Sequence, residues 1–213
     1  GMGPVGLHFI QKLGGLNQQI SIAVFGDEPW EPYNRVKLSS LISGEIKEAS
    51  LYEASNISHY SSITPFYNIR IDSIDRYAHE IIDSQGQRYG YGKLVLATGS
   101  SAHVPVIDGI DLQNVFRFRD LHDAMSLMGR SVMTRSTVVI GGGLLGLEVA
   151  KSMQRFNTDV HVIEHDMWLM FKQLDETAGR YLQEHIEKTC INVHHSQHVQ
   201  KITGEGKVAV VQL

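Results

Sequence analysis

Residues 136–156, STVVIGGGLLGLEVAKSMQRF, decide the fold of this chain. The apolar run 137–140 predicts a buried strand, and three glycines with G-x-G-x-x-G spacing follow it before a helical apolar pattern. A dinucleotide-binding loop has this order, because its first glycine makes a tight turn, its second admits a pyrophosphate and its third lets helix and strand pack closely. A cluster of packing glycines without a ligand is the alternative. The three glycines are Gly141, Gly143 and Gly146.

The segments after these glycines continue the alternation of strand and helix. A strand over 159–164 ends at Glu164, about 20 residues beyond the loop, where the fingerprint places an acid. Its carboxylate can accept hydrogen bonds from the ribose hydroxyls of NAD and would repel the 2′-phosphate of NADP. Asp166 adds a further negative charge near this point. His165 is the one residue next to Glu164 that could carry a positive charge and so attract a phosphate. A helix over 173–188 and a strand over 191–195 follow.

A similar pattern opens the chain. Gly1, Gly3 and Gly6 have the same spacing, a helical pattern covers 7–16, and ISIAVF at 20–25 predicts a strand. No strand precedes Gly1 in the sequence, and a Gly-Met dipeptide can also be left by an expression vector, which would remove Gly1 from the fingerprint. Asp27 and Glu28 end the strand, either to hold a ribose or as a solvated turn.

The segment between the two glycine loops is rich in short β patterns. Several runs between 65 and 92, with a turn at 84–87, predict a small antiparallel insert, and the apolar run 94–97 predicts a buried strand. A linker lies around 104–112, where a proline and a glycine disfavour regular secondary structure. We therefore expect two nucleotide-binding lobes, over residues 1–112 and 113–213.

Composition and charge exclude several classes of function. The formal net charge is −4, and no basic cluster long enough to follow a phosphate backbone is present, so nucleic acid is not an expected partner. The sequence has no apolar run of about 18 residues and no secretion signal, which predicts a cytoplasmic protein without a membrane partner. The single cysteine, Cys190, cannot form an internal disulfide or a C-x-x-C pair, so electron chemistry requires a bound cofactor.

Four segments together carry a family resemblance. The chain resembles the FAD-dependent pyridine nucleotide-disulfide oxidoreductases, in particular the FAD- and NAD-binding region of NAD(P)H-nitrite reductase large subunits, with rubredoxin and ferredoxin reductases as relatives. The resemblance implies an α/β fold with two Rossmann-like FAD/NAD-binding lobes. It also implies that NADH passes hydride to FAD, which passes electrons to an iron-sulfur or sirohaem module. The segments are VFGDEPWEPYNRVKLSSLISGE (24–45), KLVLATGSSAHVPVI (93–107), VVIGGGLLGLEVA (138–150) and QLDETAGRYLQEHIEK (173–188).

The resemblance also implies roles for individual residues. Arg35 matches an arginine near the flavin and its pyrophosphate, where a guanidinium fork suits an anion, although a surface ion pair is the alternative. Thr98 and Gly99 match a turn whose backbone passes close to FAD, or they form a plain turn. Glu148 matches an acid near the nicotinamide, but an acid early in a helix also interacts favourably with the helix dipole.

The sequence departs from the family pattern in several places. The closing segment of the FAD lobe has no counterpart within the 213 residues, Ser40 stands where ferredoxin reductases usually have lysine, and the cysteine-rich nitrite-reducing modules are missing. We therefore expect both lobes to be incomplete and FAD to be held weakly. A non-catalytic nucleotide-binding or interaction remnant is the alternative function. A lobe without an edge strand exposes backbone groups that a second copy can pair, so a homodimer is also an expectation.

Two further stretches need interpretation. His194, His195 and His198 lie close in sequence, and His161 and His165 flank Glu164, but neighbouring side chains on a strand point to opposite faces and no cysteine supports a tetrahedral site. The sequence therefore favours the absence of a metal site over the presence of a zinc site. The stretch MWLM at 167–170 is more typical of core or interface than of a cofactor contact.

Overall fold

A computed structural model describes residues 1–16, 20–53, 57 and 62–213. The chain forms two compact units. The first contains Gly1–Lys37 and Lys47–Ser101, and the second contains Leu38–Ile46 and Ala102–Leu213. The boundary between residues 112 and 113 that the motifs suggest stays a prediction.

The first unit begins with the predicted helix and strand. Helix α1 precedes β1, and β1 pairs in parallel with β2, so that Ile22 faces Ile63 and Phe25 faces Phe66. The small core of this unit joins α1 to both strands through Ile10, Val24, Ile57 and Ile63. Its elements are α1 (Pro4–Leu16), β1 (Ile22–Phe25), the 3₁₀ turns η1 (Arg35–Lys37) and η2 (Glu48–Leu51), β2 (Ile63–Phe66), β3 (Ile71–Asp75), β4 (Glu80–Asp83) and β5 (Arg88–Gly90).

The predicted antiparallel insert is present as the sheet β3-β4-β5. Tyr89 of β5 packs its ring edge-on against Phe25 and Phe66, with ring centroids 4.9 and 5.6 Å away, and so joins the insert to the parallel pair. The prediction of a buried strand over 94–97 is wrong, because this segment is irregular and 50% of Val95 and 65% of Leu96 are exposed. A strand needs a hydrogen-bonded neighbour, and no described segment forms a ladder with these residues.

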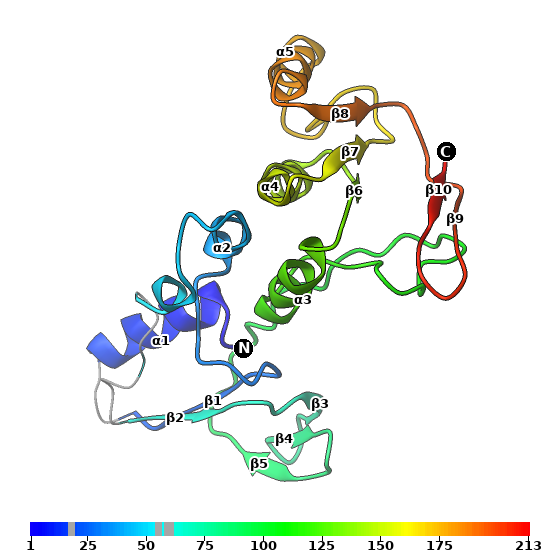
Figure 1. Cartoon of the computed structure of the whole chain (residues 1–213). Coiled ribbons are helices and arrows are strands. Elements are labelled where there is room, and N and C mark those ends of the chain that lie inside the picture. The colour runs from blue at the N-terminus through cyan, green and yellow to red at the C-terminus, as the bar shows by residue number, and fades with distance from the viewer. Residues whose placement is uncertain (17–19, 54–56, 58–61) are drawn as a thin grey trace. The chain divides into compact units, whose positions relative to one another are not determined.

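The second unit contains the parallel sheet that the central motif predicts. Its strand order is β6-β7-β8, with Ile140 opposite Ile163 and Ile163 opposite His194. Helix α4 packs against β6 and β7, and α5 packs against β8 (Figure 1). The elements are α2 (Leu38–Ser43), α3 (Leu121–Ser131), β6 (Ser136–Ile140), α4 (Leu144–Met153), η3 (Gln154–Phe156), β7 (Asp159–Ile163), α5 (Glu176–Glu187), β8 (Ile191–His194), β9 (Lys201–Thr203) and β10 (Val210–Gln212).

Local residue choices explain where these elements begin and end. β-Branched residues fill β6 and β7, which suits a sheet with a covered face, and Val160 and Val162 are fully buried. Asp175 caps α5 by accepting a hydrogen bond from the Ala178 N–H at 2.9 Å. Asn157, in the left-handed region at φ 56°, ends the turn after α4 and lets β7 begin. The predicted α/β alternation over 136–195 is confirmed. The prediction that the strand over 137–140 is buried is wrong, because β6 is an edge strand of the described sheet and Val138 and Ile140 are 37% and 43% exposed.

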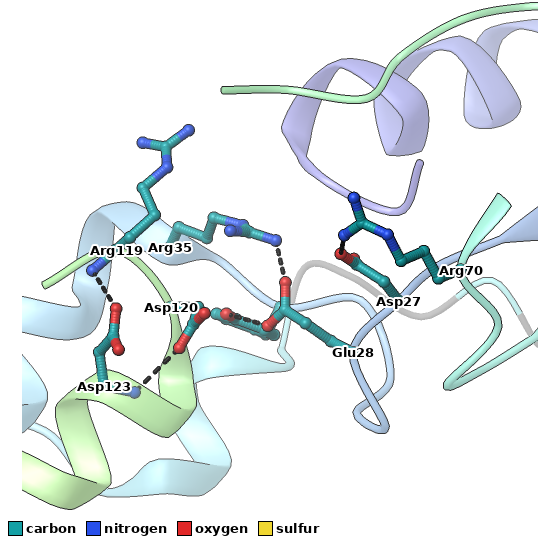
Figure 2. A network of polar contacts seen from close by, with 8 residues as sticks. Asp27, Glu28, Arg35, Arg70, Arg119, Asp120 and Asp123 are labelled. Carbon is teal, nitrogen blue, oxygen red and sulfur yellow. Dashed lines mark hydrogen bonds and ion pairs between the residues drawn. The ribbon is translucent and has the colours of Figure 1, made fainter. Parts of the chain in front are cut away.

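Helix α3 is an element that the sequence analysis did not predict. Asp120 caps it by accepting from the Asp123 N–H at 2.9 Å, and the Asp123 carboxylate accepts from the Arg119 N–H at 2.8 Å (Figure 2). This reciprocal capping is a readable signal, since an N-terminal acid followed three residues later by a second acid is typical of a helix start. Its apolar residues Leu121 and Ala124 are fully buried.

Candidate dinucleotide-binding site

The second glycine loop connects the end of β6 to the start of α4. Gly141 has φ 110°, a conformation that L side chains rarely adopt, and its N–H donates to the Ile163 carbonyl at 2.8 Å. A Cβ on Gly146 would collide with the carbonyl oxygen of Gly141, so helix and loop approach each other closely there. Gly143 is the N-cap of α4, and a Cβ on it would meet nothing within 4 Å. The loop thus presents open space at the helix N-terminus, where an anion is favoured.

Glu164 lies directly beside this loop. It is 6% exposed, and its Oε2 accepts a hydrogen bond from the Gly142 N–H at 2.7 Å. Its Oε1 accepts from the Asp166 N–H at 2.8 Å and lies 2.8 Å from Nδ1 of His165. The carboxylate therefore fixes the loop, and its contact with a ribose stays a prediction. Its Oε2 keeps one lone pair for a further donor.

The first glycine loop repeats this geometry. Helix α1 begins at Pro4, and a Cβ on Gly6 would collide with the carbonyl oxygen of Gly1. A Cβ on Gly1 would in turn collide with the carbonyl group of Ala97. A Cβ on Gly3, like one on Gly143, would meet nothing within 4 Å. The first and third glycines are therefore required by packing, and the second faces open space.

Each of the two acids after β1 faces an arginine, and for Glu28 this is Arg35, the arginine predicted to lie near the flavin. Arg35 forms an ion pair with Oε1 of Glu28, while the Tyr33 hydroxyl donates to Oε2 of Glu28 at 2.6 Å (Figure 2). Asp27 faces Arg70 at 4.0 Å, and both side chains are largely exposed. The structure thus brings Arg35 and Glu28 together and leaves the Asp27 carboxylate more accessible than that of Glu28.

Trp30, between these groups in sequence, is a residue that the sequence analysis did not single out. Its indole Nε1–H is buried and has no hydrogen-bond partner among the described residues. Leaving such a donor unsatisfied costs about 1–3 kcal/mol, and an acceptor oxygen of a ligand would remove that cost. The signal in the sequence is a tryptophan embedded in the polar segment that carries Arg35.

Of the remaining predicted residues, Thr98 has its backbone beside the first glycine loop, since a Cβ on Gly1 would lie 3.4 Å from the Thr98 Cα. Thr98 and Gly99 lie in an exposed irregular segment, with Gly99 at φ 71°. Glu148 lies in the second turn of α4 and is half-buried, and its backbone carbonyl accepts from the Ser152 hydroxyl at 2.7 Å. Their proposed contacts with cofactors stay predictions.

The stretch 167–170 supports the second glycine loop. Leu169 is fully buried, and a Cβ on Gly142 would lie 2.5 Å from its Cδ2. The Met170 N–H donates to the Gly142 carbonyl at 3.0 Å, whereas 60% of Met167 is exposed. The stretch contributes to the core through Leu169, and its backbone contact with the loop is a feature that the sequence did not reveal.

Groups of three or more metal-ligating side chains come together at two places among the described residues. Glu164, His165 and Asp166 form one group, and Asp120, His122 and Asp123 form the other. In both groups carboxylate oxygens already accept backbone N–H bonds, those of Glu164 at the glycine loop and those of the two aspartates at the start of α3. Capping and loop fixation explain these groups.

Comparison with known proteins gives the family. The sequence model of the pyridine nucleotide-disulphide oxidoreductase family matches residues 1–213, so the chain belongs to this family, as its motifs predicted. The family and its structural neighbours bind FAD and NAD(P)H. Two glycine cradles with open space at the second glycine, together with the orphaned Trp30 N–H, fit such dinucleotides.

Relatives extend well beyond this chain. The assimilatory nitrate reductase electron transfer subunit of Bacillus subtilis is 34% identical over 97% of this chain and 27% of its own length. The nitrite reductase [NAD(P)H] large subunit of Klebsiella oxytoca is 37% identical over 95% of this chain and 21% of its own length. The chain therefore spans about a quarter of these nitrate and nitrite reductase relatives.

A solved structure supports the same fold. The ferredoxin reductase for the CYP199A2 system from Rhodopseudomonas palustris superposes with a TM-score of 0.91 at 26% identity, over 99% of this chain and 52% of that chain. Within the described part of this chain, no helix has the length and apolar character needed to cross a bilayer.

Proposed function

We propose that this chain is the FAD- and NAD-binding part of an NADH-dependent flavoprotein oxidoreductase of the nitrite reductase large-subunit type. In that function hydride passes from NADH to FAD, and electrons continue to an iron-centre acceptor. The observation that carries the proposal is that both glycine loops have the same contact between first and third glycine and the same open space at the second.

The second unit would hold the nicotinamide nucleotide. Backbone N–H groups at the start of α4 would face the pyrophosphate across the open position at Gly143. Glu164, fixed by the Gly142 and Asp166 N–H groups, would offer its remaining lone pair to a ribose hydroxyl. Glu148, in the second turn of α4, would stand near the nicotinamide.

The first unit would hold the flavin nucleotide. Arg35 has five N–H donors, so it can keep Glu28 and still donate to a pyrophosphate oxygen. Asp27 is the more accessible acceptor for a ribose hydroxyl, and the turn at Thr98 and Gly99 would pass close to the cofactor. When bound, FAD supplies the capacity to accept a hydride and to release electrons one at a time.

Anaerobic reduction tests this function. The purified chain is mixed with FAD, freed of excess cofactor, and titrated with NADH while the visible absorption of oxidised flavin is recorded. Because the incomplete lobe should hold FAD weakly, we expect less than one flavin per chain to be retained, and we expect the retained flavin to be bleached by NADH. In Gly143→Val the flavin should be retained but not bleached, because the valine side chain would fill the pyrophosphate position.

Two results would contradict the proposal in different ways. A chain that retains no flavin but still binds NADH would support the alternative, a nucleotide-binding remnant that does not hold FAD. Equal bleaching in the parent chain and in Gly143→Val would remove the second loop from the nicotinamide site.

A further inference from the structure

A row of polar side chains crosses β7 and β8 on one face of the parallel sheet. His161 pairs with Asn192 in the strand register, and residues two apart on a strand share a face. Asp159 and His161 of β7 and Asn192 and His194 of β8 therefore all lie on the same face. This row is separate from the glycine loop and is not used by the proposed function.

The row is connected by hydrogen bonds. Nδ1 of His161 lies 3.1 Å from Nε2 of His194, and Nε2 of His161 lies 3.1 Å from Oδ2 of Asp159. The Asn192 side-chain amide donates to Oδ1 of Asp159 at 3.0 Å. Only 30% of the His161 side chain is exposed, so its ring is held in place.

The carboxylate determines which nitrogen of His161 carries a proton. With Nε2–H donating to Asp159, the lone pair of Nδ1 points toward His194. A histidine that ligates a metal almost always donates its other ring N–H to a carboxylate, a backbone carbonyl or water, which fixes the ring and raises its basicity. Asn192 in turn orients Asp159, so the outer contacts of a metal ligand are already present.

The spacing of the two ring nitrogens also suits a cation. Two nitrogens bound to one zinc ion at 2.0–2.1 Å with tetrahedral angles are about 3.3 Å apart. The 3.1 Å between His161 and His194 differs from that by only a few tenths of an ångström.

We propose that His161 Nδ1 and His194 Nε2 form a chelating site for a divalent transition metal of the zinc, copper or nickel type. An ion on the line between the two nitrogens would be only about 1.6 Å from each, so both rings must turn slightly to converge on an ion beside that line. The proton shared by the rings leaves Nε2 of His194 for water or for its own Nδ1, and water completes the coordination of the ion. The sequence disfavoured a metal because neighbouring histidines on one strand point apart. The structure pairs histidines from two adjacent strands instead.

Calorimetric titration of the full chain with Zn²⁺ near neutral pH tests the site. We expect one ion per chain, with tight binding lost in His161→Gln and in His194→Gln. Asp159→Asn should weaken binding about 10- to 100-fold while both ligands remain. His195→Gln is the matched control, because His195 follows His194 directly but its Nδ1 faces the Ser196 hydroxyl at 3.3 Å.

Electron paramagnetic resonance with Cu²⁺ gives a readout that is independent of affinity. The parent chain should show two imidazole nitrogens on the copper, and His194→Gln should show one or none. The proposal is overturned if zinc binds as tightly to His161→Gln and His194→Gln as to the parent chain. It is equally overturned if His195→Gln loses as much affinity as they do, or if no ion binds stoichiometrically.

Discussion

The carbonyl oxygen of Gly1 lies so close to Gly6 that a Cβ on Gly6 would collide with it. Gly141 and Gly146 have the same relationship in the other unit, so two segments far apart in the sequence build the same turn. Because the contact joins backbone atoms, it depends on the absence of a side chain and not on a ligand. The third glycine of each loop is thus a packing requirement, and the second is the position that a ligand can use.

This distinction predicts that one alanine substitution in the second loop destabilises the protein and another does not. Gly→Ala within a helix usually gains about 1 kcal/mol in propensity, but in Gly146→Ala the Cβ would displace the Gly141 carbonyl, at a cost of about 1–3 kcal/mol. We expect Gly146→Ala to lower the melting temperature and Gly143→Ala to leave it nearly unchanged. Thermal unfolding followed by circular dichroism measures both, and a higher melting temperature for Gly146→Ala would contradict the packing role.

The fold around the second loop could be predicted because local and global signals agree there. The run 137–140 is apolar and β-branched, the glycines are correctly spaced, and Glu164 ends the next strand. The segment 94–97 has an equally apolar pattern but is irregular, since a strand depends on a neighbour that the pattern cannot supply. Helix α3 was missed although Asp120 and Asp123 are a recognisable capping pair.

The candidate site could be predicted in its backbone but less well in its side chains. Glycine spacing fixes loop geometry locally, and so it can be read from sequence. The Glu28–Arg35 pair, the support of Gly142 by Leu169 and the His161–His194 pair arise from contacts between separate segments. No sequence period encodes such contacts.

Asp83 in the β4–β5 turn should make stability depend on pH. Burial raises the pKa of its carboxyl, but backbone N–H bonds from Gln87 and Gln85, both 2.9 Å, and the Tyr89 hydroxyl at 3.1 Å outweigh burial and lower it. A lowered pKa in the folded state means stability that is present above the unfolded pKa, about 3.9, and is lost as pH falls through the folded pKa.

We therefore expect Asp83→Asn to be less stable than the parent chain at neutral pH, with the difference shrinking on acidification. Urea unfolding at neutral pH and at about pH 3 measures it. Asp111→Asn, at an exposed position, is the control and should be near neutral at both pH values. A stability difference that does not change with pH would show that the Asp83 charge is not the group responsible.

The start of α3 gives a prediction of opposite sign. Burial raises the pKa of Asp123, and the nearby Asp120 carboxylate raises it further. A raised pKa in the folded state means stability that is present below the unfolded pKa and is lost as pH rises through the folded pKa. Asp120→Asn keeps an oxygen to cap the helix but removes the like charge, so the pKa of Asp123 should fall toward its ordinary value.

Carbon-detected NMR titration of the Asp123 carboxyl measures this shift directly. Asp120→Ala, which also loses the cap, should destabilise the protein by about 1 kcal/mol. A pKa of Asp123 that is the same in Asp120→Asn and in the parent chain would mean that burial alone sets it.

We expect the choice between NADH and NADPH to depend on Glu164. The Gly142 and Asp166 N–H groups hold its carboxylate in place, so it cannot turn away from a 2′-phosphate. Repulsion at this range is worth on the order of 1–3 kcal/mol, and we expect NADH to bind about 10- to 100-fold more tightly than NADPH.

Glu164→Gln removes the charge while its amide oxygen can still accept from Gly142, so the preference should fall about tenfold. His165→Gln removes a neighbouring group that can become cationic and should leave or increase the preference for NADH. Nicotinamide fluorescence titrations of the three chains with both nucleotides provide the comparison. An unchanged ratio of affinities in Glu164→Gln would place the adenosine ribose elsewhere and leave Glu164 with only its contact to the glycine loop.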